Sequence, residues 1–154
     1  MANNENIKYL IRRAEVLDAE EMAMIDQRCL LLPWSVDSFH RELTKNKIAM
    51  YIVAECGGLV VGYAGVWRVE DEGHITNVAV LPEYRGKRIA SSLLEEMFDL
   101  CGKNGIVDYT LEVRVSNFPA ISLYEKHGFE SEGIRPGYYQ DNHEDAMIMW
   151  RRGR

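Results

Sequence analysis

The chain has few cysteines and histidines and no long apolar run. Its three cysteines, Cys29, Cys56 and Cys101, lie far apart, and together with four scattered histidines they form no metal-binding pattern. We therefore expect no metal site, and we expect the three thiols to be small core side chains. No stretch approaches the roughly 18 apolar residues that span a bilayer. The polar start Met-Ala-Asn-Asn-Glu-Asn is unlike a signal peptide. These absences favour a cytoplasmic protein without membrane contact.

An excess of basic charge is also missing. The net charge is −6 over 154 residues, which argues against a broad grip on the phosphate backbone of a nucleic acid. The charge suits a cationic partner such as a basic peptide or a free amine, although most acidic proteins are acidic only for solubility. No repeat, linker or low-complexity stretch divides the chain. We expect residues 1–154 to form a single domain with a buried core.

The hydrophobic pattern predicts a mixed α/β fold. Strand-like runs occur at 8–13, 49–55, 59–69, 74–81, 107–115, 129–132 and 146–151. Helices are expected after the N-cap candidates Asp18 and Ser35, over 89–101, and around Pro119. Short connections between the early strands suggest an antiparallel meander. Strands linked by helices imply local parallel pairing in the second half. We expect a mixed, mostly antiparallel sheet of six to seven strands flanked by about four helices.

A basic turn joins an expected strand to a long helix within residues 74–94, HITNVAVLPEYRGKRIASSLL. Backbone N–H groups at the start of a helix lack intrahelical partners and therefore bind anions well. Gly86 permits a close approach, and Arg85, Lys87 and Arg88 add positive charge. The turn predicts a pyrophosphate site, although a solvated basic turn has the same pattern.

Two polar side chains in the second half are candidates for acid–base chemistry. Residues 111, 113 and 115 are apolar and share one face of their strand, so Glu112 lies on the other face. Glu112 is either a surface residue paired with Arg114 or a general base beside a cleft. Asn117 and Tyr124 are seven residues apart and share one helical face. Tyr124 is either a half-buried core tyrosine or the proton donor that a departing thiolate needs.

Taken together, these motifs resemble the GNAT superfamily, the Gcn5-related N-acetyltransferases, and within it the RimI branch. The GNAT signature is Arg or Gln, two variable residues, Gly or Ala, one variable residue, then Gly or Ala. Arg85 and Ala90 match it, while Arg88 stands where glycine is usual. TLEVRVSNFPAISLYEKHGF and IRPGYYQDNHEDAMIMW carry the RimI resemblance, together with PWS at 33–35 and GYAG at 62–65. The resemblance covers nearly the whole chain.

The resemblance implies a GNAT-like fold and acetyl-CoA as cosubstrate. In the RimI branch the acceptor is a protein N-terminus, associated with the N-terminal alanine of a small-subunit ribosomal protein. Glu112 would be the base and Tyr124 the acid, with direct acetyl transfer and no acyl-enzyme. Coenzyme A contacts would come from Val78, Ala79, Val80, Arg85, Gly86, Lys87, Arg88, Ile89, Ala90, Ser91 and Asn117.

The peptide groove is assigned less directly. Trp34, Tyr138 and Tyr139 would shape it, unless these aromatic side chains serve only core or turn packing. Two other functions stay open on the sequence alone: a GNAT enzyme that acetylates lysine or a small-molecule amine, and a coenzyme A-binding module without catalysis.

Overall fold

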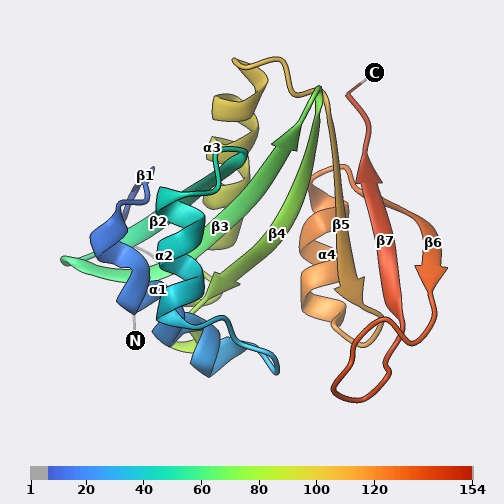
Figure 1. Cartoon of the computed structure of the whole chain (residues 1–154), viewed down its shortest axis with the longest axis horizontal. Coiled ribbons are helices and arrows are strands. Elements are labelled where there is room, and N and C mark those ends of the chain that lie inside the picture. The colour runs from blue at the N-terminus through green and yellow to red at the C-terminus, as the bar shows by residue number, and fades with distance from the viewer. Residues whose placement is uncertain (1–6, 154) are drawn as a thin grey trace.

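One seven-stranded sheet dominates the computed structural model, which describes residues 7–153 (Figure 1). The strands are β1 (Leu10–Arg13), β2 (Ala49–Cys56), β3 (Leu59–Val69), β4 (Glu72–Val80), β5 (Asp108–Arg114), β6 (Glu130–Arg135) and β7 (Ala146–Arg151). The α-helices are α1 (Ala19–Cys29), α2 (Val36–Thr44), α3 (Ile89–Gly102) and α4 (Phe118–Lys126). The strand order is β1-β2-β3-β4-β5-β7-β6, and only β4 and β5 pair in parallel. The expected mixed, mostly antiparallel sheet of six to seven strands flanked by about four helices is confirmed.

The predicted helix starts are correct in position, but the two caps differ in chemistry. Ser35 caps α2 as expected, because its hydroxyl accepts a hydrogen bond from the Ser38 N–H at 3.1 Å. Asp18 precedes α1 without capping it. Its carboxylate instead binds the Arg12 guanidinium and the Glu15 N–H. Burial opposes ionisation of Asp18, but the bonds from Arg12 and Glu15 lower its pKa, so the side chain fastens β1 to the start of α1.

Two layers of helices enclose the sheet. Helices α1 and α2 lie against β2, β3 and β4 on one face, and α3 packs on the other (Figure 1). The aromatic rings of Phe39, Tyr51 and Tyr63 meet beneath α1 and α2. Gly65 is required there because an added Cβ would overlap the Tyr51 ring. Within residues 7–153 no helix has the length and apolarity needed to cross a membrane.

The sheet splits between its two halves. β4 and β5 are paired at only three positions, from Glu72↔Asp108 to His74↔Thr110, and then diverge (Figure 1). The register of β4 against β3 also shifts between Gly65 and Val66, which leaves Thr76 as the extra residue of a bulge. A bulge bends its strand and increases the local twist. The remainder of β4 therefore keeps β3 as its neighbour and leaves its other edge without a strand partner.

Candidate active site

A cleft of about 960 Å³ opens where β4 and β5 diverge. Its walls come from β4, β5, the starts of α3 and α4, the α1–α2 loop and the β6–β7 loop. The site residues expected from the sequence that line it are Trp34, Val78, Ala79, Val80, Arg85, Gly86, Arg88, Ile89, Ala90, Ser91, Glu112, Asn117, Tyr124, Tyr138 and Tyr139. Lys87 is the one expected site residue that is not part of this lining.

Glu112 reaches the cleft from β5 and is bonded to a histidine that sequence reasoning did not select. The His74 Nε2 atom lies 2.8 Å from Glu112 Oε1, and the Glu112 side chain is 16% exposed. The bond to His74 lowers the pKa of Glu112 despite the opposing effect of burial. Because β5 lies between β4 and β7, Glu112 is not on an outer strand of the sheet. Its side-chain partner is His74, whereas Arg114 pairs with Asp141 and Glu144.

Tyr124 lies in α4 with its ring buried, and it also lines the cleft. Its ring packs on Phe129, so the core role and the cleft position coexist. Burial, with a smaller effect of Tyr139, raises the pKa of the phenol above its usual value. Tyr124 is therefore protonated near neutral pH and can donate a proton.

The turn before α3 contains two residues in the left-handed backbone conformation, Gly86 and Arg88. Arg88 is the residue before α3 and has φ +65°, in the left-handed region. Its side chain, 73% exposed, lies 3.4 Å from Glu95. Gly86 has φ +78° with open space where a Cβ would be. Arg88 is therefore strained where the GNAT signature usually has glycine, because an L side chain disfavours this conformation.

The open edge of β4 presents backbone groups to the cleft. The Leu81 N–H points to β3, where it bonds Val61 O at 2.8 Å. In an antiparallel pair the backbone groups of alternate residues point to opposite sides. The N–H and C=O groups of Val78 and Val80 therefore point away from β3, toward the cleft. The Val80 carbonyl accepts the Arg85 Nε–H at 2.9 Å, and the Val78 N–H donates to Asn77 Oδ1 at 2.9 Å. This edge can pair with an extended, amide-bearing ligand as an added strand would.

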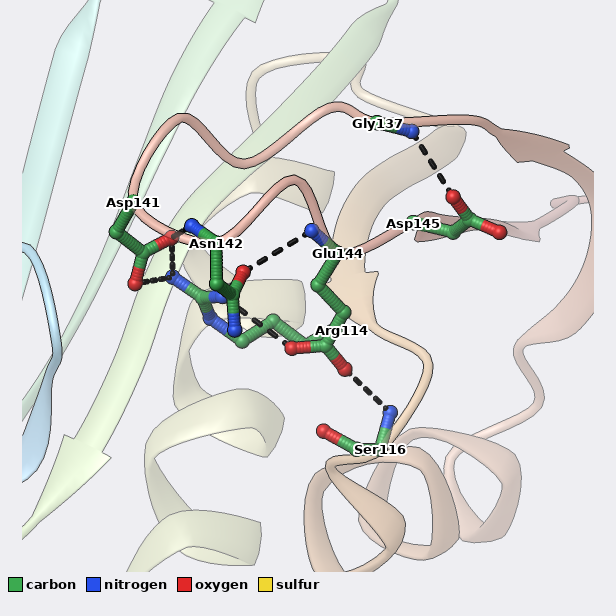
Figure 2. Close-up of polar contacts among 7 residues, drawn as sticks. All are labelled: Arg114, Ser116, Gly137, Asp141, Asn142, Glu144 and Asp145. Carbon is green, nitrogen blue, oxygen red and sulfur yellow. Dashed lines mark hydrogen bonds and ion pairs between the residues drawn. The ribbon is translucent and has the colours of Figure 1, made fainter.

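Arg114 anchors the β6–β7 loop (Figure 2). The same loop carries both expected groove tyrosines, Tyr138 and Tyr139. The Arg114 guanidinium donates to both carboxylate oxygens of Asp141 at 3.1 Å and to Glu144 at 3.3 Å. It also lies 4.0 Å from the centre of the Tyr139 ring. The second Glu144 oxygen accepts the Ser116 N–H at 3.0 Å, so the second half of this loop is tied to the end of β5.

The cysteine prediction is correct in full for Cys101 and in part for Cys29 and Cys56, which pack against the edge of the core. Cys101 is buried, whereas Cys29 and Cys56 are only partly buried. Cys29 ends α1 and lines the cleft, with its sulfur 3.5 Å from both Arg85 Nη2 and the Val80 carbonyl oxygen. Burial nevertheless raises the pKa of this thiol, which disfavours the thiolate that a nucleophile needs.

The fold and the cleft together define a class of enzyme. A strand edge and a basic, anion-binding turn suit a carrier that has both amide and phosphate groups, while a carboxylate and a protonated phenol line the same cleft. Residues 19–129 match the acetyltransferase (GNAT) family. The chain therefore belongs to that family: it is an N-acetyltransferase, and its cosubstrate is acetyl-CoA.

Relatives align over almost the whole chain. A protein of Bacillus subtilis described as a putative ribosomal protein bS18-alanine N-acetyltransferase is 43% identical, covering 93% of this chain and 95% of the relative. The ribosomal protein bS18-alanine N-acetyltransferase of Escherichia coli K12 is 35% identical, covering 90% and 94%. A crystal structure of the ribosomal-protein-S18-alanine N-acetyltransferase from Escherichia coli superposes with a TM-score of 0.86 at 33% identity, covering 95% and 94%.

Proposed function

We propose that the chain acetylates the α-amino group of a protein N-terminus, and that its substrate is the N-terminal alanine of ribosomal protein bS18. The observation that carries the proposal is that Glu112, a carboxyl group whose pKa is lowered, and Tyr124, a phenol whose pKa is raised, line one cleft. The names and the coverage of the relatives support the choice of substrate. A ribosomal-protein substrate would place the enzyme in the cytoplasm.

The residues of the cleft fit coenzyme A. The backbone N–H groups from Gly86 to Ser91 and the guanidinium groups beside them would hold its phosphates. The open edge of β4 at Val78–Val80 would hold its pantetheine arm. Asn117 uses its Oδ1 to cap α4 by accepting the Ala120 N–H at 3.3 Å, which leaves its amide N–H groups for the ligand. When bound, acetyl-CoA supplies an acetyl group activated as a thioester.

Glu112 would accept the proton of the amine, directly or through one water. An α-amino group has a pKa of about 7.7–8, against about 10.4 for lysine, so deprotonation near neutral pH costs about 3 kcal/mol less. A carboxylate with a lowered pKa is a weak base, and it therefore favours the α-amine over lysine.

The amine nitrogen would attack the thioester carbonyl as the carbon–sulfur bond breaks. Tyr124 would give its proton to the departing sulfur, and the second proton that the nitrogen loses as the amide forms would return Tyr124 to its protonated state. The first proton, taken by Glu112, would leave to solvent by way of His74. Holding both reactants in one cleft would supply much of the rate.

The peptide groove would lie between the α1–α2 loop and the β6–β7 loop. Trp34 contributes one wall and Tyr138 and Tyr139 the other, and all three line the cleft. The Arg114 anchor would hold the second wall in place. The net charge of −6 would favour a basic peptide.

The experiment compares peptides with the bS18 N-terminal sequence carrying either a free or a blocked α-amine, each with an internal lysine. We expect acetylation of the free α-amine only, and equal acetylation of the blocked peptide would refute the assignment. Glu112→Gln and Tyr124→Phe should each lower turnover by about 10²-fold or more with little change in coenzyme A affinity. Glu130→Gln, on the exposed strand β6, is the matched control, and full activity in both site variants would contradict the mechanism.

A further inference from the structure

A chain of hydrogen bonds joins the α1–α2 loop to the open edge of β4. The Trp34 N–H donates to Asp26 Oδ2 at 3.0 Å, and the Tyr63 hydroxyl donates to Asp26 Oδ1 at 2.5 Å. The Asn77 Nδ2–H donates to the Tyr63 oxygen at 3.0 Å. The chain ends at the Val78 N–H, which donates to Asn77 Oδ1 at 2.9 Å. All five residues line the cleft.

The middle of this chain is rigid. Asp26 and Tyr63 are each 1% exposed, and a buried polar group that loses its partner costs about 1–3 kcal/mol. Burial raises the pKa of Asp26, and burial together with Asp26 raises the pKa of Tyr63. Asn77 is therefore held through its amide nitrogen by a group that has little freedom to move.

The side-chain oxygen of Asn77 accepts a hydrogen bond from a backbone N–H, that of Val78, which a ligand needs as a donor. The Val78 N–H belongs to the edge of β4 that has no strand partner, and Asn77 Oδ1 covers it. A carbonyl of the acyl carrier that pairs with this edge must take the same N–H. The Asn77 oxygen would then lose its bond to the Val78 N–H. Because Tyr63 still holds the amide nitrogen, this oxygen would stay at the cleft wall, free to accept another hydrogen bond.

We propose that Asn77 is a substrate-binding residue that acetyl-CoA makes available: the carrier carbonyl takes the Val78 N–H, and the freed Asn77 Oδ1 accepts a hydrogen bond from the incoming amine. This inference rests on the proposed function for the identity of the amine. One amine N–H would then face Glu112 and another Asn77, which orients the nitrogen lone pair. The peptide would therefore bind more tightly after acetyl-CoA has bound. By reciprocity, bound peptide would raise the affinity for acetyl-CoA by the same factor.

The test is a calorimetric titration of an alanine-initiated peptide into the protein in three states. These are the protein alone, the protein with coenzyme A, and the protein with an unreactive ketone analogue in which CH₂ replaces the thioester sulfur. We expect at least one carrier to tighten peptide binding by about fivefold or more, within the range typical of coupled sites. Coupling by coenzyme A assigns the Val78 N–H to a pantetheine amide, and coupling by the ketone alone assigns it to the acetyl carbonyl.

Asn77→Ala should abolish the coupling and, because the internal competitor is gone, bind the carrier alone more tightly. Asn104→Ala is the matched control, because Asn104 is exposed, lies outside the cleft lining and uses its side chain to donate to the Leu100 carbonyl. Tyr63→Phe keeps Asn77 but removes its anchor, so it should reduce the coupling even if Asn77→Ala folds poorly. Thermal melts of each variant report folding separately.

Equal peptide affinity in all three states of the wild-type protein would overturn the inference, and so would unchanged coupling in a folded Asn77→Ala. If the wild-type protein acetylates free N-termini but shows no coupling, only this inference fails. If it acetylates no free N-terminus, the proposed function fails first.

Discussion

Replacing Arg88 by glycine should stabilise the free protein and weaken its hold on coenzyme A. Arg88 has φ +65°, and the left-handed conformation costs an L residue about 1–2 kcal/mol. Glycine removes that strain but gains about 0.4–1 kcal/mol of unfolded-state entropy. The exposed pair with Glu95 contributes little. The net stabilisation is therefore about 0.5–1 kcal/mol, which corresponds to about 1–4 °C in melting temperature for a domain of this size.

The cofactor effect has the opposite sign. Arg88 lines the cleft at the end of the basic turn, and an exposed ion pair between its side chain and a phosphate would be worth up to about 1 kcal/mol. Coenzyme A affinity should therefore fall by about two- to fivefold at low salt, and the loss should shrink as salt screens the charge. Calorimetric melting of the free protein and titration with coenzyme A at two salt concentrations measure the two effects separately.

Two controls separate strain from charge. Gly86→Ala adds a Cβ at φ +78° with nothing within 4 Å, so it should lower the melting temperature through strain without removing a charge. Arg88→Lys keeps both the strain and the charge and should resemble the wild type in both assays. A lower melting temperature for Arg88→Gly, or an unchanged affinity for coenzyme A, would refute the reasoning.

Three further predictions concern the β6–β7 loop, the partner of Glu112 and the aromatic core. Arg114→Lys should raise KM for the peptide severalfold with little change for acetyl-CoA, because lysine lacks the planar fork that binds Asp141; equal KM values would exclude a positioning role. His74→Ala removes the bond that lowers the pKa of Glu112, so the acid limb of the kcat/KM profile should move to higher pH, and an unmoved limb would contradict this. Gly65→Ala forces overlap in the aromatic cluster and should cost about 1–3 kcal/mol in urea unfolding; wild-type stability would show that the core can adapt.

The lowered pKa of Glu112 also links its ionisation to stability. A carboxyl group whose pKa is lower in the folded protein stabilises the fold above its unfolded pKa of about 4.3. This contribution is lost as the pH falls through the folded value. In Glu112→Gln the free energy of unfolding, measured in urea, should fall less as the pH is lowered. An unaltered pH dependence would show that ionisation of Glu112 does not stabilise the fold.

Most of the elements could be predicted because their signals are local. The alternation of residues 110–114 placed Glu112 on the face opposite Leu111 and Val113, and the structure buries those two residues. The apolar stripe of residues 89–101 predicted α3, and the hydroxyl of Ser35 predicted the cap of α2, in the same way. Asp18 was misjudged because its carboxylate has a better partner in Arg12, and that partner becomes adjacent only after β1 and α1 are placed.

By itself the sequence determined which segments are strands and helices, which turn can bind an anion, and which residues were candidates for the acid and the base. Periodicity and turn chemistry depend on a few neighbouring residues, so they can be recognised without knowing which distant segment packs against them. Only the tertiary structure decided that β4 leaves β5 after three pairs, that His74 meets Glu112, and that Asn77 covers the Val78 N–H. The first two depend on pairing between segments more than thirty residues apart, and the third on a strand edge that exists only because the sheet splits.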